Sequence, residues 1–189
     1  MLKQLWSAPN QLTLLRLCMV PLLVIAVLDR HFRTACALFV LAGISDAMDG
    51  VLARCLHQKT VLGQYLDPIA DKLLLSTLFL VLTHVGLIPR SVTVLVFSRD
   101  FGVVILGALM FAVAGLRDFG PSIFGKANTL AQILAVMGVL VSQFYSPVIV
   151  VLVRQTALYA TMGLTVLSAL HYVMLSQRRM DEAALSANP

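Results

Sequence analysis

Long apolar stretches alternate with short polar ones along most of the chain. Because a membrane-spanning helix needs about 20 consecutive apolar residues, each long stretch predicts one spanning helix. The six stretches are residues 12–28, 34–54, 64–85, 91–114, 126–143 and 148–175. The pattern therefore predicts an all-α integral membrane protein, a six-transmembrane-helix bundle formed as one domain over residues 1–189.

The two ends of the chain are more polar than these stretches. Residues 1–8 are expected to form a short interfacial segment, with Lys3 and Trp6 at the level of the lipid headgroups. No pattern of a cleavable signal peptide is present there. The polar tail begins at about residue 176 and is expected to fray beyond the last span.

Composition strengthens the membrane interpretation. Of the 189 residues, 59% are hydrophobic and only 12% are charged, whereas a soluble domain carries roughly 25% charged residues. We therefore expect the membrane and its lipids as partners, and no nucleic acid. The three cysteines, Cys18, Cys36 and Cys55, are too widely spaced for a disulfide framework or a thiolate metal site.

The distribution of basic residues predicts the orientation in the membrane, because cytoplasmic flanks carry more Lys and Arg. With a cytoplasmic N-terminus, one side carries Lys3, Arg54, Lys59, Arg117, Lys126, Arg178 and Arg179, and the other carries Arg30, Arg33 and Arg90. Both termini are therefore expected in the cytoplasm, as is the junction between the second and third stretches.

That junction, DAMDGVLARCLHQKTVLGQYLDPIAD over residues 46–71, holds four of the nine acidic residues. Asp46 and Asp49 are three apart and Asp67 and Asp71 are four apart, so each pair shares one face of a helix. The loop expected between Arg54 and Gly63 lets the two helices run antiparallel. The four carboxylates should then converge near the cytoplasmic end of the bundle.

Such a cluster needs cations, because like charges in a poorly solvated place destabilise one another. Lys72 or Arg54 could neutralise one aspartate, but this density of oxygen ligands favours Mg²⁺ or Mn²⁺ over zinc. Because Mg²⁺ usually completes its shell with water and phosphate, two such cations would imply a phosphate-bearing substrate.

The residues between the aspartates suit a diphosphate ligand. Gly50, Ala53 and Gly63 leave the backbone beside the carboxylates open, although small residues also serve close helix packing. Arg54 adds a planar fork of donors. Two alternatives stay open on this reasoning: an ion-pair network, and a proton or cation pathway of a small membrane transporter.

The complete pattern is D-x2-D-G-x2-A-R-x8-G-x3-D-x3-D, from Asp46 to Asp71. It resembles the signature of the CDP-alcohol phosphatidyltransferases at every specified position. The segment PNQLTLLR before the first stretch and the basic segment before the fifth are similar to that family as well. A transporter would leave Gly50, Arg54 and Gly63 without a shared reason.

The resemblance implies a phospholipid-biosynthesis enzyme of the cytoplasmic membrane of a bacterium, commonly a homodimer, with its site open to the cytoplasm. Such enzymes transfer a phosphatidyl group from CDP-diacylglycerol to an alcohol and release CMP. By resemblance, two divalent cations bind Asp46, Asp49, Asp67 and Asp71, and Asp71 is also the catalytic base. The residues that would hold CDP are Asn10, Thr13, Gly50, Ala53, Arg54, Thr60 and Gly63.

The acceptor alcohol is the least constrained part of this interpretation. Cations that could bind it are Arg99, Arg117, Lys126 and Arg154, although Asp100 could simply neutralise Arg99 and Lys126 could be an interfacial anchor. SRD at residues 98–100, with PSxxxKxNT at 121–129, looks more like the branch that accepts phosphatidylglycerol, the CMP-forming cardiolipin synthases. The alternative is the glycerol 3-phosphate branch, in which an Arg-Glu pair is expected at that place.

Overall fold

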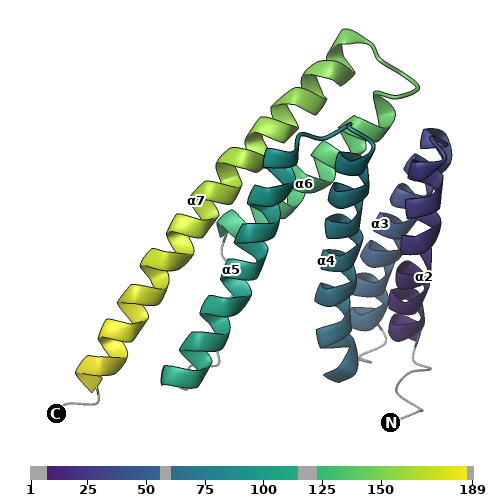
Figure 1. The fold of residues 1–189 in the computed structure, drawn as a ribbon. Helices are drawn as coiled ribbons and strands as arrows, with labels where there is room; N and C mark the ends of the chain where they lie inside the picture. The colour runs from purple at the N-terminus through teal and green to yellow at the C-terminus, as the bar shows by residue number, and fades with distance from the viewer. Residues whose placement is uncertain (1–7, 56–60, 115–122, 187–189) are drawn as a thin grey trace. The chain divides into compact units, whose positions relative to one another are not determined.

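The computed structural model of the chain describes residues 8–55, 61–114 and 123–186, which form six helices and no strand (Figure 1). The helices are α2 (Ala8–Leu28), α3 (Phe32–Cys55), α4 (Val61–His84), α5 (Arg90–Ala114), α6 (Ile123–Val141) and α7 (Val148–Ser186). The all-α prediction is confirmed for these residues. Their number and order match the six apolar stretches.

Most helix boundaries differ from the predicted ones by a few residues, and two of the differences change the interpretation. α4 begins at Val61, so Gly63 lies within the helix rather than at the end of a loop. α7 continues to Ser186, so the expectation that the tail frays from residue 176 is wrong for most of its length. The segment 182–185 reads EAAL, and these strong helix formers extend the helix beyond the last apolar residue.

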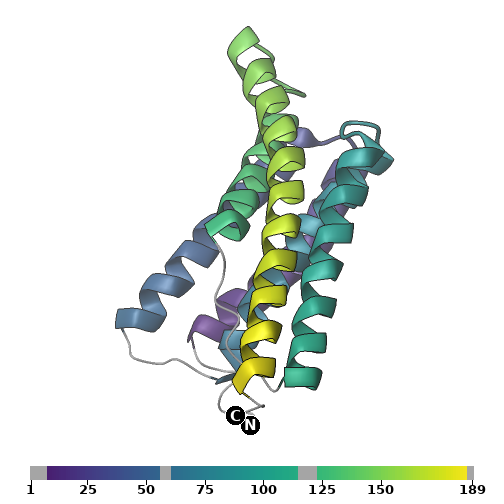
Figure 2. The ribbon, with the colours of Figure 1, turned by 90° about the vertical axis from the view of Figure 1, so that its left-hand side faces the viewer.

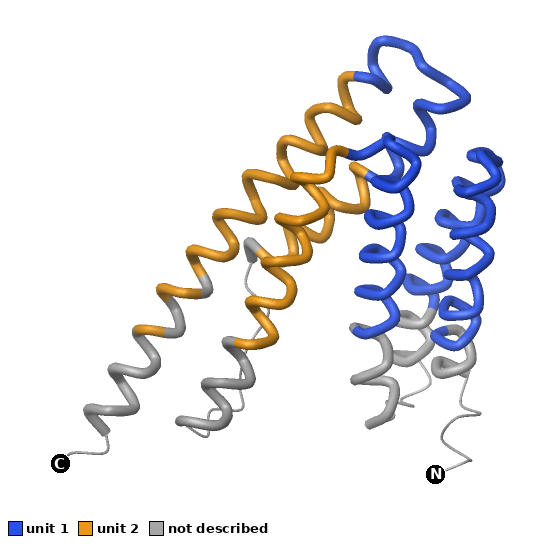
Figure 3. The backbone as a smooth tube through the Cα atoms, viewed as in Figure 1, with its two compact units in different colours: residues 1–88, 136–151 blue, residues 89–135, 152–189 orange. Residues whose placement is uncertain are grey.

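The described chain divides into two compact units, coloured separately in Figure 3. Unit 1 comprises residues 1–88 and 136–151, and unit 2 comprises residues 89–135 and 152–189.

In unit 1, α2 packs against both α3 and α4. Its core is formed by fully or almost fully buried side chains on these three helices. They include Leu23 and Val27 of α2, Ala42 of α3, and Leu78, Phe79 and Leu82 of α4. Unit 1 therefore places one face of α2 at the junction of α3 and α4.

A three-residue turn joins α2 to α3. The amide of His31 donates to the carbonyl of Ala26 at 2.8 Å, and that of Arg30 donates to Val27 at 3.1 Å. Arg30 has φ of 58°, the left-handed conformation that follows a helix end of this kind. The same arrangement ends α4, where Gly86 supplies the positive φ of 80° and Leu87 donates to the carbonyl of Leu82 at 2.8 Å.

In unit 2, α5 and α7 run side by side in both views (Figures 1 and 2). Polar side chains are buried along a seam that involves all three helices of this unit: Arg99 of α5, Asn128 and Gln132 of α6, and Thr161, Thr165 and Ser168 of α7. A hydrogen bond of 3.1 Å from Thr165 Oγ1 to Asn128 Oδ1 joins α7 to α6. These side chains give unit 2 a partly polar interior.

One segment of the described residues, Val148–His171 in α7, is long and apolar enough to cross a membrane by length and composition. The shorter apolar segments Thr13–Leu28 and Gly125–Val141 lie in α2 and α6. Six membrane spans remain a prediction from the sequence.

Candidate active site

A buried arginine joins two of the predicted metal ligands. Arg16 of α2 lies with Nη2 at 2.9 Å from Oδ1 of Asp46 in α3. Its Nη1 lies at 2.6 Å from Oδ1 of Asp71 in α4. Two carboxylates that are 25 residues apart in sequence thus meet on one guanidinium, and three helices of unit 1 are joined at this point.

Burial is distributed unevenly over these three side chains. The side chain of Arg16 is 1% exposed, whereas those of Asp46 and Asp71 are 48% and 43% exposed. The guanidinium therefore approaches the carboxylates from the protein interior. The carboxylates keep an open side on which a ligand could bind.

Helical periodicity explains why α2 presents Arg16 to this place. Thr13 and Arg16 are three residues apart on one continuous helix, and both are fully buried. Thr13 was predicted to bind CDP, and it shares a buried helix face with the arginine that holds two predicted metal ligands.

The role of Arg16 was missed at the level of sequence, although PNQLTLLR was part of the resemblance. A signal was available. Arg16 is the one charged residue of the apolar stretch 12–28, and a charge inside such a stretch is by default functional or paired.

The donor chemistry of the two described aspartates fits a hard divalent cation. Both offer half-exposed carboxylate oxygens, the ligands that Mg²⁺ and Mn²⁺ prefer. Among the side chains that the structure describes, no group of three or more His, Cys, Asp or Glu forms a metal cluster. The other two predicted ligands, Asp49 and Asp67, fall outside those side chains, although their backbones lie in α3 and α4.

Most of the predicted CDP-binding residues also lack a described side chain. They are Asn10 in α2, Gly50, Ala53 and Arg54 in α3, and Gly63 in α4. Thr60, and Arg117 from the acceptor set, lie outside the described residues altogether.

Arg99, a predicted acceptor ligand, is buried and paired in unit 2. Its Nη1 donates to Oδ1 of Asp100 at 2.8 Å. Its Nη2 and Nε donate to Oγ of Ser168 in α7, at 2.8 and 3.3 Å. Asp100 thus does neutralise Arg99, which was the alternative interpretation of this residue, and Ser168 is a partner that the sequence did not indicate.

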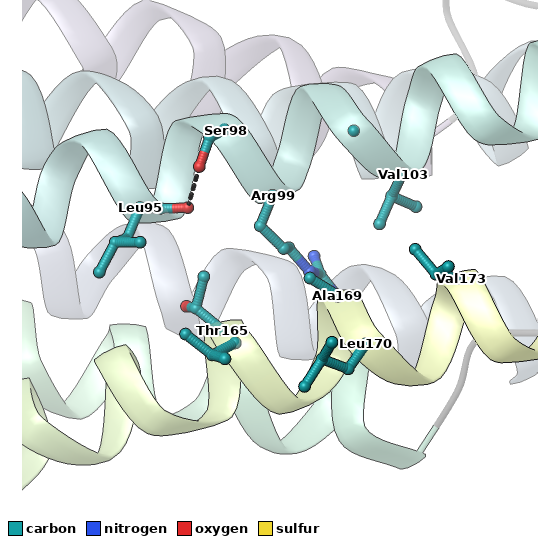
Figure 4. A pocket seen from close by; sticks show the side chains of 10 residues that line it. Leu95, Ser98, Arg99, Val103, Thr165, Ala169, Leu170 and Val173 are labelled. Atoms are coloured by element: carbon teal, nitrogen blue, oxygen red, sulfur yellow. Dashed lines mark hydrogen bonds between the residues drawn. The ribbon is translucent and has the colours of Figure 1, made fainter.

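A pocket of about 280 Å³ opens between α5 and α7 beside Arg99 (Figure 4). Its walls are mainly apolar, with Leu95 and Val103 from α5 and Val166 and Leu170 from α7. In Figure 4, Arg99 projects from α5 toward α7 at the centre of the pocket. Of the described acceptor candidates, Arg99 lines this pocket and Lys126 and Arg154 do not.

Lys126 and Arg154 are placed elsewhere in unit 2. Lys126 lies in the first turn of α6 and is exposed. Arg154 lies near the start of α7, and its Nε is buried without a hydrogen-bond partner in the described part of the chain.

A family model of the CDP-alcohol phosphatidyltransferases matches residues 6–167. A cardiolipin synthase (CMP-forming) of Rattus norvegicus is 33% identical over 162 residues, covering 75% of this chain and 52% of the rat protein. The chain thus spans about half the length of that relative.

Two bacterial relatives are matched over more of their length. The CDP-diacylglycerol–glycerol-3-phosphate 3-phosphatidyltransferase of Bacillus subtilis (strain 168) is 30% identical over 184 residues, covering 89% of this chain and 94% of the relative. A probable phosphatidylglycerophosphate synthase of Mycobacterium tuberculosis (strain ATCC 25618 / H37Rv) is 37% identical over 175 residues, covering 89% and 81%.

Proposed function

The chain belongs to the CDP-alcohol phosphatidyltransferase family, and we propose that it transfers the phosphatidyl group of CDP-diacylglycerol to phosphatidylglycerol, forming cardiolipin and releasing CMP. The observation that carries the transferase chemistry is the meeting of Asp46 and Asp71 on Arg16, with both carboxylates half exposed. A related enzyme with a glycerol 3-phosphate acceptor is the second candidate.

In this proposal Asp46, Asp49, Asp67 and Asp71 hold two divalent cations, Mg²⁺ or Mn²⁺. Bound there, the cations would neutralise the diphosphate of the donor and stabilise the CMP leaving group. The oxygen donors and open sides of Asp46 and Asp71 support this assignment. Asn10, Thr13, Gly50, Ala53, Arg54, Thr60 and Gly63 would hold the CDP moiety.

Asp71 is proposed to accept the proton of the attacking hydroxyl. The hydroxyl oxygen forms a bond to the phosphorus of the phosphatidyl group, and the bond from that phosphorus to the CMP oxygen breaks. The proton passes to a carboxylate oxygen of Asp71, and CMP leaves with the electron pair. The half-exposed position of Asp71 allows an acceptor to approach within hydrogen-bonding distance.

The pocket between α5 and α7 supports a lipid acceptor. Leu95, Val103, Val166 and Leu170 suit hydrocarbon, and its α7 wall includes part of the segment apolar enough to cross a membrane. The volume of about 280 Å³ is close to the lower bound of ~300 Å³ for small-molecule pockets. The guanidinium of Arg99, which lines the pocket, is already paired with Asp100. This pairing favours a largely apolar guest over a free phosphate ester.

A glycerol 3-phosphate acceptor is favoured by a different observation. Of the two bacterial relatives described above, the Bacillus subtilis enzyme carries glycerol-3-phosphate in its name, and the other is named a probable phosphatidylglycerophosphate synthase. In that case Lys126, which is exposed in the first turn of α6, and Arg117 or Arg154 would be the cations that bind the acceptor phosphate.

We place the enzyme in the cytoplasmic membrane of a bacterium as a six-span homodimer, with both termini and the site on the cytoplasmic side. The apolar segment Val148–His171 and the apolar composition support the membrane location, and the asymmetry of Lys and Arg supports the orientation.

The test is CMP release by the purified full chain in liposomes with CDP-diacylglycerol and Mg²⁺ or Mn²⁺, with each acceptor supplied separately. Turnover with phosphatidylglycerol alone, yielding cardiolipin, supports the proposal. Turnover with glycerol 3-phosphate alone would support the phosphatidyl transfer and show that glycerol 3-phosphate is the acceptor instead. Absence of CMP with both acceptors, together with flux of the cation across the liposome membrane, would favour the transporter instead.

A further inference from the structure

We infer that Arg16 is a positioning residue, which fixes the carboxylates of Asp46 and Asp71 from the protein interior in the orientation that binds the divalent cations. The inference deepens the proposed function and rests on its assignment of these two aspartates as metal ligands.

Arg16 contacts the two carboxylates from the protein interior, and their other side is exposed. Arg16 contacts Oδ1 of each carboxylate. Its own side chain is 1% exposed while the two aspartates are 48% and 43% exposed. A cation arriving from solvent therefore meets carboxylates whose inner oxygens are already held.

Charge alone would not require an arginine. Two carboxylates close together repel each other, and any buried cation would offset that repulsion. The planar guanidinium adds a fixed geometry, because two of its nitrogens point to two different acceptors at once. Here Nη1 and Nη2 select Asp71 and Asp46, which lie on different helices.

Arg16 is itself held rigidly enough for this task. It is fully buried on α2, and α2 packs against both helices that carry the aspartates. Groups that hydrogen-bond to metal ligands in this way orient those ligands, and their loss usually lowers metal affinity by about 10- to 100-fold.

The alternatives predict different results. If Arg16 served only as a counter-charge, its removal would raise the affinity for a divalent cation, since a positive charge beside the site would be gone. If Arg16 only tied the helices together, its removal would lower the unfolding temperature and leave the affinity of the folded protein unchanged.

The experiment measures Mn²⁺ binding to the full chain in detergent, without any substrate, through the paramagnetic resonance signal of free Mn²⁺. We expect Arg16→Gln to lower the affinity by about 10- to 100-fold. Arg16→Lys keeps the charge but loses the fork, so we expect it to fold and still to bind Mn²⁺ at least about 10-fold more weakly than the wild type.

Arg99→Gln is the matched control, because Arg99 is also a buried arginine paired with an aspartate, in the other unit. It should leave Mn²⁺ affinity unchanged. Wild-type affinity in folded Arg16→Lys, tighter binding in Arg16→Gln, or an equal loss in Arg99→Gln would each overturn the inference. A wild-type chain that binds no Mn²⁺ would overturn the proposed metal site as well, whereas a loss of turnover with normal Mn²⁺ binding in the Arg16 variants would overturn the inference alone.

Discussion

Ser168 of α7 accepts two hydrogen bonds from the guanidinium of Arg99 in α5, from Nη2 at 2.8 Å and from Nε at 3.3 Å. Because all three atoms are buried within an apolar unit, this small hydroxyl compensates much of the desolvation of a charged group. It also ties together the two helices whose side chains form the walls of the pocket.

Replacing Ser168 by Ala should lower the free energy of unfolding by about 1–3 kcal/mol, since buried guanidinium donors lose their acceptor. Thermal or denaturant unfolding in detergent measures this change. Ser98→Ala is the control, because Ser98 is exposed and donates to the carbonyl of Leu95 in its own helix. The two variants should differ clearly, and equal stability would contradict the role given to Ser168.

Gly102 offers a way to fill the pocket between α5 and α7. It lines the pocket, and a Cβ added there meets no atom within 4 Å. Gly102→Leu should therefore fold, occupy the space and lower kcat/KM for phosphatidylglycerol by about 10-fold or more, as occlusion of an apolar pocket by a few methylenes would.

Gly163→Leu is the control for that experiment, because its added Cβ is equally unobstructed and Gly163 is not among the pocket residues. It should leave kcat/KM unchanged. Unaltered kinetics with phosphatidylglycerol in Gly102→Leu would show that the acceptor does not use this pocket.

Asp71→Asn should lower turnover by about 10²- to 10⁴-fold, the usual contribution of a general base. Much of the donor binding should persist, because the amide keeps the shape of the carboxylate. CMP release measures the first effect, and binding of CDP-diacylglycerol measures the second. Complete loss of donor binding would argue that Asp71 acts chiefly as a metal ligand.

Asp29→Asn provides the comparison for Asp71→Asn. Asp29 is an exposed aspartate in the turn between α2 and α3, so its neutralisation should leave CMP release within experimental error of the wild type.

Removal of divalent cations with a chelator should abolish CMP release, because four carboxylates cannot by themselves neutralise a diphosphate. Mg²⁺ or Mn²⁺ should restore activity, and Zn²⁺ should restore it poorly, because the proposed ligands are all oxygen atoms. Full activity in the chelated enzyme would contradict the proposed metal site.

Replacement of Gln132 tests whether this member of the polar seam of unit 2 stabilises the fold. Its Nε2 is buried and has no hydrogen-bond partner within the described part of the chain. Gln132→Leu should therefore raise the free energy of unfolding by about 1 kcal/mol, or leave it unchanged, since an unsatisfied donor is removed. A marked loss of stability would reveal a partner outside the described side chains.

The sequence was sufficient to predict the number and order of the described helices. Apolar length predicted six helices in order, and the spacing of Asp67 and Asp71 was compatible with the continuous helix α4. Similarity to the family supplied the chemistry. The helices and the spacing of the aspartates are local features, because they depend on residues near one another in the chain.

The partners of buried polar groups could not be predicted in the same way. Helices that are apolar all round give little indication of which face packs against which neighbour. The pairing of Arg16 with two aspartates, and of Arg99 with Ser168, depends on contacts between helices distant in sequence. Arg16 could have been suspected as an isolated charge, whereas Ser168 gave no comparable signal.

The lengths of the helical arms on either side of the turn between α2 and α3 bring Arg16 and Asp46 to the same level. Arg16 lies 28 − 16 = 12 residues before the end of α2, and Asp46 lies 46 − 32 = 14 residues after the start of α3. At 1.5 Å per residue these are axial distances of about 18 and 21 Å, so the two side chains reach the same level.

One residue inserted into either arm of this hairpin would turn the far end of that helix by about 100°, moving Arg16 or Asp46 off the shared face. We therefore expect the lengths of the two arms to be under strong evolutionary constraint. Natural insertions and deletions should be excluded from the helical arms at residues 16–28 and 32–46, and tolerated at residues 142–147, which join α6 to α7.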